Sequence, residues 1–103
     1  MIKVIIKNDS ITISGHANYD VYGKDIVCAA VSATVITTVN GILSIDKNAI
    51  EVNETNNVEI KILKNNDIVD KLINNMINLL TELQKDYKDN IDSFYKKIKG
   101  III

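Results

Sequence analysis

The chain has 103 residues, of which 47% are hydrophobic and only 5% aromatic, and its formal net charge at pH 7 is −1. That length fits a single domain over residues 1–103 with an aliphatic core. All twelve basic residues are lysines, and they form no basic stripe with arginine forks. We therefore expect no direct binding of nucleic acid.

One cysteine rules out a disulfide within the chain and cannot form a Cys/His zinc site alone, so we expect neither a metal nor another cofactor. The first ten residues, MIKVIIKNDS, are too short and too regularly alternating for a signal peptide. No stretch of the sequence approaches a membrane span by inspection. The expectation is a cytoplasmic protein without a membrane partner.

The first elements are predicted strands. Ile2, Val4 and Ile6 alternate with other residues, as in a strand with one buried face, and the alternation resumes from Ile11 to Gly15 after a polar turn. The two strands should form a hairpin. Residues 17–24 show no period and contain Gly23, where the chain can turn.

Residues 25–40 are ambiguous, because their Val, Ile and Thr content favours a strand while sixteen residues are long for one. Asp25 is a good N-cap and Gly41 a good C-cap, so the interpretation is a helix. It is apolar on nearly every side and should be buried against a sheet or a partner chain. An exposed apolar patch of that size predicts a homodimer.

A second hairpin is predicted from residues 49–52 and 58–63, followed by a long helix that Asp67 can cap. A short further helix is predicted over residues 90–99. The predicted fold class is α+β, a two-layer sandwich in ββα-ββα order, with an antiparallel sheet and helices packed on one face. The long helix has an apolar stripe at helical spacing: Val69, Leu72, Ile73, Met76, Leu80, Leu83 and Tyr87.

The only histidine, His16, and the only cysteine, Cys28, lie twelve residues apart. Cys28 falls in the first turn of the predicted helix, where free amides and the helix dipole favour a thiolate and offer an oxyanion hole. His16 falls at a strand end before an aperiodic loop. Together they are the nucleophile and the base of a cysteine hydrolase. The alternative is a packed thiol and a surface imidazole.

The neighbouring residues allow two interpretations each. Asp25 caps the helix, orients the imidazole, or does both. Ser32, one turn after Cys28, either approaches the thiolate or only packs the helix. Tyr19 and Tyr22, together with Gly23 in the loop between base and nucleophile, either line a peptide groove or cover the core.

The segments SGHA, from Ser14, and GKDIVCAAVSA, ending at Ala33, resemble the signature of the ribosomal-processing cysteine protease family, Prp. The resemblance implies a catalytic dyad of His16 and Cys28, supported by Asp25, with Ser32 close by. It also implies a homodimer that cuts the N-terminal extension from a large-subunit ribosomal protein after a pair of aromatic residues. The competing hypothesis is a non-catalytic, ribosome-associated binding module with an inert, buried Cys28.

Overall fold

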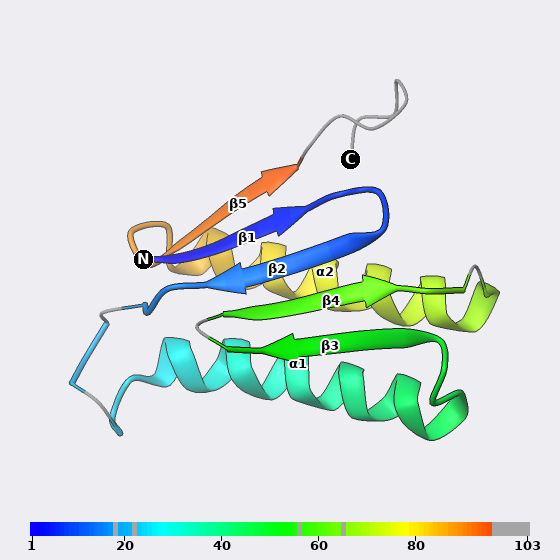
Figure 1. Ribbon diagram of the computed structural model, residues 1–103. Coiled ribbons are helices and arrows are strands. Elements are labelled where there is room, and N and C mark those ends of the chain that lie inside the picture. The colour runs from blue at the N-terminus through cyan, green and yellow to red at the C-terminus, as the bar shows by residue number, and fades with distance from the viewer. Residues whose placement is uncertain (18, 22, 56, 65, 96–103) are drawn as a thin grey trace.

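The computed structural model describes residues 1–95 apart from 18, 22, 56 and 65. Its strands form one five-stranded sheet in the order β3-β4-β2-β1-β5, and both helices cover the same face of it (Figure 1). The predicted α+β two-layer sandwich is therefore confirmed. The elements are β1 (Ile2–Ile6), β2 (Ser10–Ser14), α1 (Ile26–Ile45), β3 (Ile50–Glu54), β4 (Val58–Ile62), α2 (Asp67–Asp86) and β5 (Ile91–Tyr95).

Both predicted hairpins are present, since β1 pairs antiparallel with β2 and β3 pairs antiparallel with β4. The alternation in β1 places Ile2, Val4 and Ile6 in the core and leaves Lys3 exposed on the other face. Strand β2 joins the hairpins by pairing with β4 as well. The sheet thus presents an aliphatic face to the two helices and a more polar face to solvent.

The helix predicted over residues 90–99 is wrong. Residues 91–95 form β5, which pairs parallel with β1 from Ile2 and Ile91 onward, so the sheet is mixed rather than purely antiparallel. Residues 96–99 of that prediction lie outside the described part of the chain. A short apolar run is compatible both with the period of a helix and with the alternation of a strand. Burial of Ile91 and the open edge of β1 favour the strand.

The first helix is longer than predicted. It does not end at Gly41 but continues to Ile45, where Asp46 forms the C-cap. A glycine inside a helix costs about 1 kcal/mol relative to alanine. Full burial of Ile42 in the next turn outweighs that cost, since burying such a side chain contributes about 1.5–3 kcal/mol.

Helix α1 is also more one-sided than predicted. Its buried stripe consists of Val27, Val31, Val35, Val39 and Ile42, which face the sheet and α2. Its outer side keeps Ile26 and Ile36 more than half exposed. One side of this helix is therefore covered within the chain and the other is not.

By length and composition α1 could cross a membrane, so the expectation that no stretch approaches a span is wrong on those two criteria. Core helices of soluble proteins pass the same test, and a single such helix is weak support for a membrane assignment. In this fold the stripe from Val27 to Ile42 packs into the sandwich.

Helix α2 follows its predicted pattern closely. Val69, Ile73, Met76 and Leu80 are buried, while the asparagines on the opposite side are exposed. The N-cap is Asn66 rather than Asp67, and its side chain accepts a hydrogen bond from the Ile68 N–H. Asp67 is instead the first residue of the helix, where its negative charge interacts favourably with the positive end of the helix dipole.

Candidate active site

The candidate site is a cleft of about 750 Å³ at one end of the sandwich. The loop after β2, the start of α1 and the β3–β4 turn meet at this end (Figure 1). The cleft brings together five of the residues singled out from the sequence. They are His16, Gly23, Asp25, Cys28 and Ser32.

Gly15 sets the position of His16. It has a φ of +84°, and a Cβ at this position would collide with the carbonyl oxygen of Met1. Both the backbone angle and the close approach require glycine. The chain therefore turns sharply at the end of β2 and presents His16, whose side chain is exposed, at the mouth of the cleft.

Cys28 lies in the first turn of α1, partly exposed, with its side chain against the edge of the core. The backbone N–H of Ala17 donates a hydrogen bond to its Sγ atom over 3.3 Å. Ala17 directly follows His16 and is itself buried. The loop that carries His16 is thus in direct contact with the Cys28 sulfur.

Asp25 is the N-cap of α1, as predicted. Its Oδ1 atom accepts hydrogen bonds from the N–H groups of Val27 and Cys28, each over 3.0 Å. Its Oδ2 atom accepts from the N–H groups of Tyr19, over 3.0 Å, and Asp20, over 3.5 Å. The bond from Cys28, together with the others, lowers the pKa of Asp25 below its ordinary value of 3.8 against an opposing effect of desolvation.

Two expectations about Asp25 and its surroundings change in the structure. The amides of Val27 and Cys28 were candidates for an oxyanion hole, but the Asp25 carboxylate occupies both. Asp25 also binds four backbone amides, and no hydrogen bond joins it to His16 among the described residues. The carboxylate therefore ties the loop to the helix rather than orienting the imidazole directly.

The two tyrosines and Ser32 differ in their placement. Tyr19 is half exposed and stacks edge-on against Tyr87, with ring centroids 5.5 Å apart, so it lies over the end of α2 and not in the cleft. Tyr22 lies outside the described residues. Ser32 is exposed on α1 and lines the cleft one turn beyond Cys28.

Two contacts that hold the loop were not predicted from the sequence, one from Asn90 and one from Tyr87, which was predicted only as part of the apolar stripe of the second helix. The side-chain amide of Asn90 donates to the carbonyl of Ala17 over 2.9 Å, and the Asn90 carbonyl accepts from the N–H of Ile2. Tyr87 supplies the ring against Tyr19. Asn90 is one of thirteen asparagines, and no local pattern distinguishes it from the others.

The assembled groups are a thiol at a helix start, an imidazole on an anchored loop and a buried backbone N–H at the sulfur. This set is able to perform nucleophilic attack with general acid–base assistance. Within the described residues, no hydrogen bond joins His16 to Cys28, and no group of three His, Cys, Asp or Glu side chains is close enough to hold a metal ion.

A model of the family described as cysteine protease Prp matches residues 1–92. The chain belongs to this family. It is accordingly a cysteine protease. The family match spans both helices and every strand up to the start of β5.

Two curated relatives from Staphylococcus aureus strains, each named ribosomal processing cysteine protease Prp, are 31% identical to this chain over 94 residues. That alignment covers 87% of this chain and 89% of each relative.

Solved structures agree in fold. The crystal structure of an essential ribosomal processing protease Prp from S. aureus with a covalently linked product peptide has a TM-score of 0.83 at 26% identity, covering 92% of this chain and 97% of that one. The same protein with a substrate peptide gives 0.77 at 25% identity over the same shares. The structure of SMU.848 from Streptococcus mutans gives 0.74 at 23% identity, covering 94% and 90%, and supports the fold alone.

Proposed function

We propose that this cysteine protease removes the N-terminal extension of a large-subunit ribosomal protein, with Cys28 as nucleophile and His16 as general base and acid. The observation that carries the residue roles is the hydrogen bond from the Ala17 N–H to the Cys28 sulfur. It joins the loop of the only histidine to the only cysteine inside a cleft of peptide size. The relatives' name, ribosomal processing protease, supports the class of substrate.

In the proposed reaction His16 takes the thiol proton and the Cys28 sulfur attacks the scissile carbonyl carbon. The tetrahedral oxyanion collapses, the C–N bond breaks, and the imidazolium gives its proton to the leaving amine. Water, deprotonated by His16, then attacks the thioester. The carbonyl–sulfur bond breaks, the imidazolium returns its proton to the sulfur, and the new carboxylic acid releases a proton to solvent, so that the free thiol and neutral His16 are restored.

The oxyanion needs a donor other than the helix-start amides that Asp25 occupies. We assign this role to the Ala17 N–H, which lies at the sulfur in the resting site and can turn to the neighbouring oxyanion once the sulfur has bonded to the carbonyl carbon. A preorganised backbone donor of this kind contributes roughly 10²–10³ to turnover in acyl-transfer enzymes. His16 is exposed here, and catalytic hydrogen bonds commonly tighten only once substrate is bound.

The test is cleavage of the ribosomal protein from the same genome, carrying its extension, with the new N-terminus determined by mass spectrometry. The native chain should release one defined leader peptide, and the Cys28→Ala chain should release none. An intact substrate with both chains would favour the non-catalytic binding module. In that case Cys28 should also alkylate slowly at every pH, whereas a nucleophile shows a rate that rises as the thiol ionises.

We further propose that the protein is a cytoplasmic homodimer. Ile26 and Ile36 are 56% and 55% exposed on the outer side of α1, and the exposed residues between them include Ala29 and Ala33. A second copy would cover this apolar strip. Sedimentation equilibrium at micromolar protein should give twice the chain mass, and a clean monomer would reject the proposal.

A further inference from the structure

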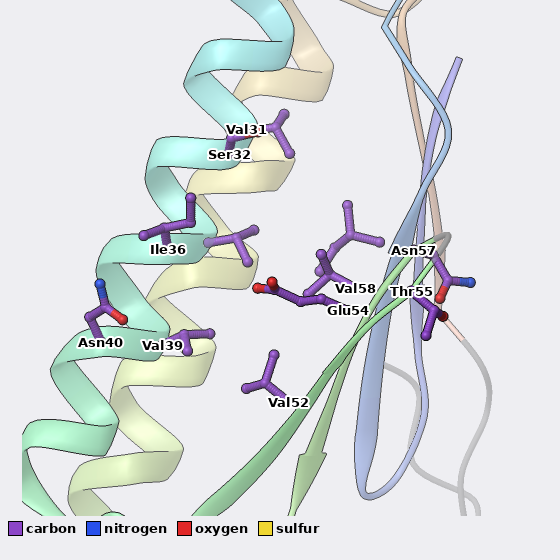
Figure 2. A pocket seen from close by; sticks show the side chains of 12 residues that line it. Val31, Ser32, Ile36, Val39, Asn40, Val52, Glu54, Thr55, Asn57 and Val58 are labelled. Carbon is purple, nitrogen blue, oxygen red and sulfur yellow. The ribbon is translucent and has the colours of Figure 1, made fainter.

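A second cavity, of about 360 Å³, lies beside the catalytic cleft between α1 and the edge strand β3 (Figure 2). The two cavities share wall residues Ile13, Val31, Ser32, Asn57 and Val58. They are therefore adjacent along the flank of α1. A peptide held in the cleft would reach the second cavity by continuing along this helix.

Most of this cavity is apolar. Val35, Ile36 and Val39 contribute from α1, and Val52 contributes from β3. Figure 2 shows Val31 and Val39 directed from the helix toward the strands, across the space that the cavity occupies. Branched aliphatic walls of this kind bind the methylene groups of a side chain rather than a polar head.

Glu54 is the one charged residue among the described lining residues, which also include the polar Ser32, Asn40, Thr55 and Asn57. Ile50 is buried and Val52 half-buried on the helix side of β3, and Glu54 is the next position on that side, whereas Glu51 points to the other face. Figure 2 shows the Glu54 carboxylate reaching from the strand toward α1. Within the described part of the chain, no hydrogen bond or ion pair engages this carboxylate.

We propose that this cavity is a specificity subsite for a lysine or arginine side chain of the peptide substrate, an inference that rests on the proposed protease function. The methylene stem of such a side chain packs against Val35, Val39 and Val52, and its cation pairs with Glu54. Lys and Arg commonly bury their stems while their charge stays near water. A carboxylate beside apolar walls matches that division.

The position of the subsite follows from helix geometry. Cys28 and Ile36 are eight residues apart on α1, which corresponds to about 12 Å along the helix axis. An extended peptide advances about 3.3 Å per residue, so the basic residue lies about three or four residues from the scissile bond. The cavity would thus bind the side chain of a substrate residue that is remote from the reacting carbonyl.

A different role for Glu54 would be to protect the edge of the sheet, because inward-pointing charges on edge strands discourage pairing with other chains. The two roles predict different measurements. A protective charge affects self-association and leaves peptide preference unchanged, whereas a subsite changes the preference.

The experiment uses synthetic peptides that span the leader and the first mature residues of the ribosomal protein. Each peptide places Lys, Ala or Glu at one position within five residues of the scissile bond. Competition in one reaction, followed by mass spectrometry, gives relative kcat/KM values. We expect the native chain to prefer Lys over Ala about two- to fivefold at one position three or four residues away, as for a partly exposed ion pair. Glu54→Gln should remove the preference, and Glu54→Lys should shift it to the Glu peptide.

Glu51→Lys is the matched control, because it makes the same charge change on the same strand but on the opposite face. It should leave the Lys preference intact. An equal preference in the native chain and in both Glu54 variants overturns the subsite. A Glu54→Lys chain that changes its sedimentation mass but not its peptide preference also overturns it and assigns the cavity to contact between copies.

The two proposals fail separately. If no peptide is cleaved, the protease function proposed above fails for this substrate. The subsite is then tested with the Cys28→Ala chain by anisotropy of fluorescein-labelled Lys and Ala peptides. Tighter binding of the Lys peptide that Glu54→Gln abolishes supports the subsite, and equal binding of both peptides rejects it.

Discussion

The two helices have the same length and cover the same face of the sheet, yet they differ in which of their sides are covered. Helix α2 buries one apolar stripe and gives its polar side to solvent. Helix α1 buries a stripe as well, but its first turn holds Cys28 and one of its flanks lines both cavities. The apolar side chains that α1 leaves uncovered, Ile26 and Ile36, are the basis on which we propose contact with a second copy. The number of apolar residues in a helix therefore says little until it is known which side of the helix is covered.

The largest effect should come from the start of α1. We predict that Cys28→Ala and Cys28→Ser each abolish cleavage of the leader-bearing substrate, since an alcohol is a far weaker nucleophile than a thiolate near neutral pH. His16→Ala should lower turnover by roughly a hundredfold or more. Thermal unfolding should be almost unchanged in all three, which circular dichroism can check. Activity in Cys28→Ala would exclude Cys28 as the nucleophile.

A substitution within α2 should have the opposite signature. Met76 is fully buried, and Met76→Ala should lower the free energy of unfolding by about 2–5 kcal/mol through lost contacts and a cavity. Turnover per folded molecule should stay near the native value. Asn75→Ala, on the exposed side, is the control and should change stability by less than about 0.5 kcal/mol in urea titrations. Loss of turnover without loss of stability in Met76→Ala would show that α2 also shapes the cleft.

The connection from α2 to β5 should show an intermediate effect. Asn90→Ala removes the donor to the Ala17 carbonyl and should lower kcat by about tenfold, as expected when a positioned group shifts within a site. Asn90→Asp should behave similarly, because a carboxylate has no N–H to donate. The neighbouring Asp89→Ala is the control. The rate of Cys28 alkylation, followed by stopped flow, should fall in the two Asn90 variants. An unchanged rate would show that the Asn90–Ala17 hydrogen bond does not affect the reactivity of the sulfur.

The smallest effect on the helix start should come from Asp25→Asn, because asparagine is also a good N-cap, although its amide nitrogen cannot accept the hydrogen bonds that Oδ2 receives from Tyr19 and Asp20. The native pKa of Asp25 lies below its ordinary value of 3.8. Its charge therefore contributes stability that is complete above that value and is lost as pH falls through the native pKa. The stability difference between the native chain and the variant should be constant from neutral pH to about pH 5 and then shrink. A difference that grows on acidification would contradict this assignment.

Local patterns were sufficient for much of the fold and of the site. Alternation identified β1 to β4, the stripe from Val69 to Leu80 identified α2, and Asp25 identified the start of α1. The residues His16 and Cys28 stood out because each type occurs once, and the structure places the loop of His16 in contact with the Cys28 sulfur.

What sequence could not reveal depends on contacts between distant parts of the chain. Residues 91–95 form a strand because β1 has an unpaired edge there. Helix α1 continues past Gly41 because Ile42 is buried in the core. Asn90 matters only because it meets Ala17, 73 positions away. Glu54 matters only because β3 lies beside α1. No period or spacing within a short window carries such information.

The bond between Asn90 and Ala17 has a consequence for the order in which the protein acquires activity. Synthesis proceeds from the N-terminus, so His16 and Cys28 exist long before the residue that anchors their loop has been made. The parallel partner of β1 is likewise among the last described segments to form. Assembly of the cleft thus waits for contacts of long sequence separation, which form slowly. A newly synthesised chain should therefore gain its proteolytic activity only at the end of its own folding.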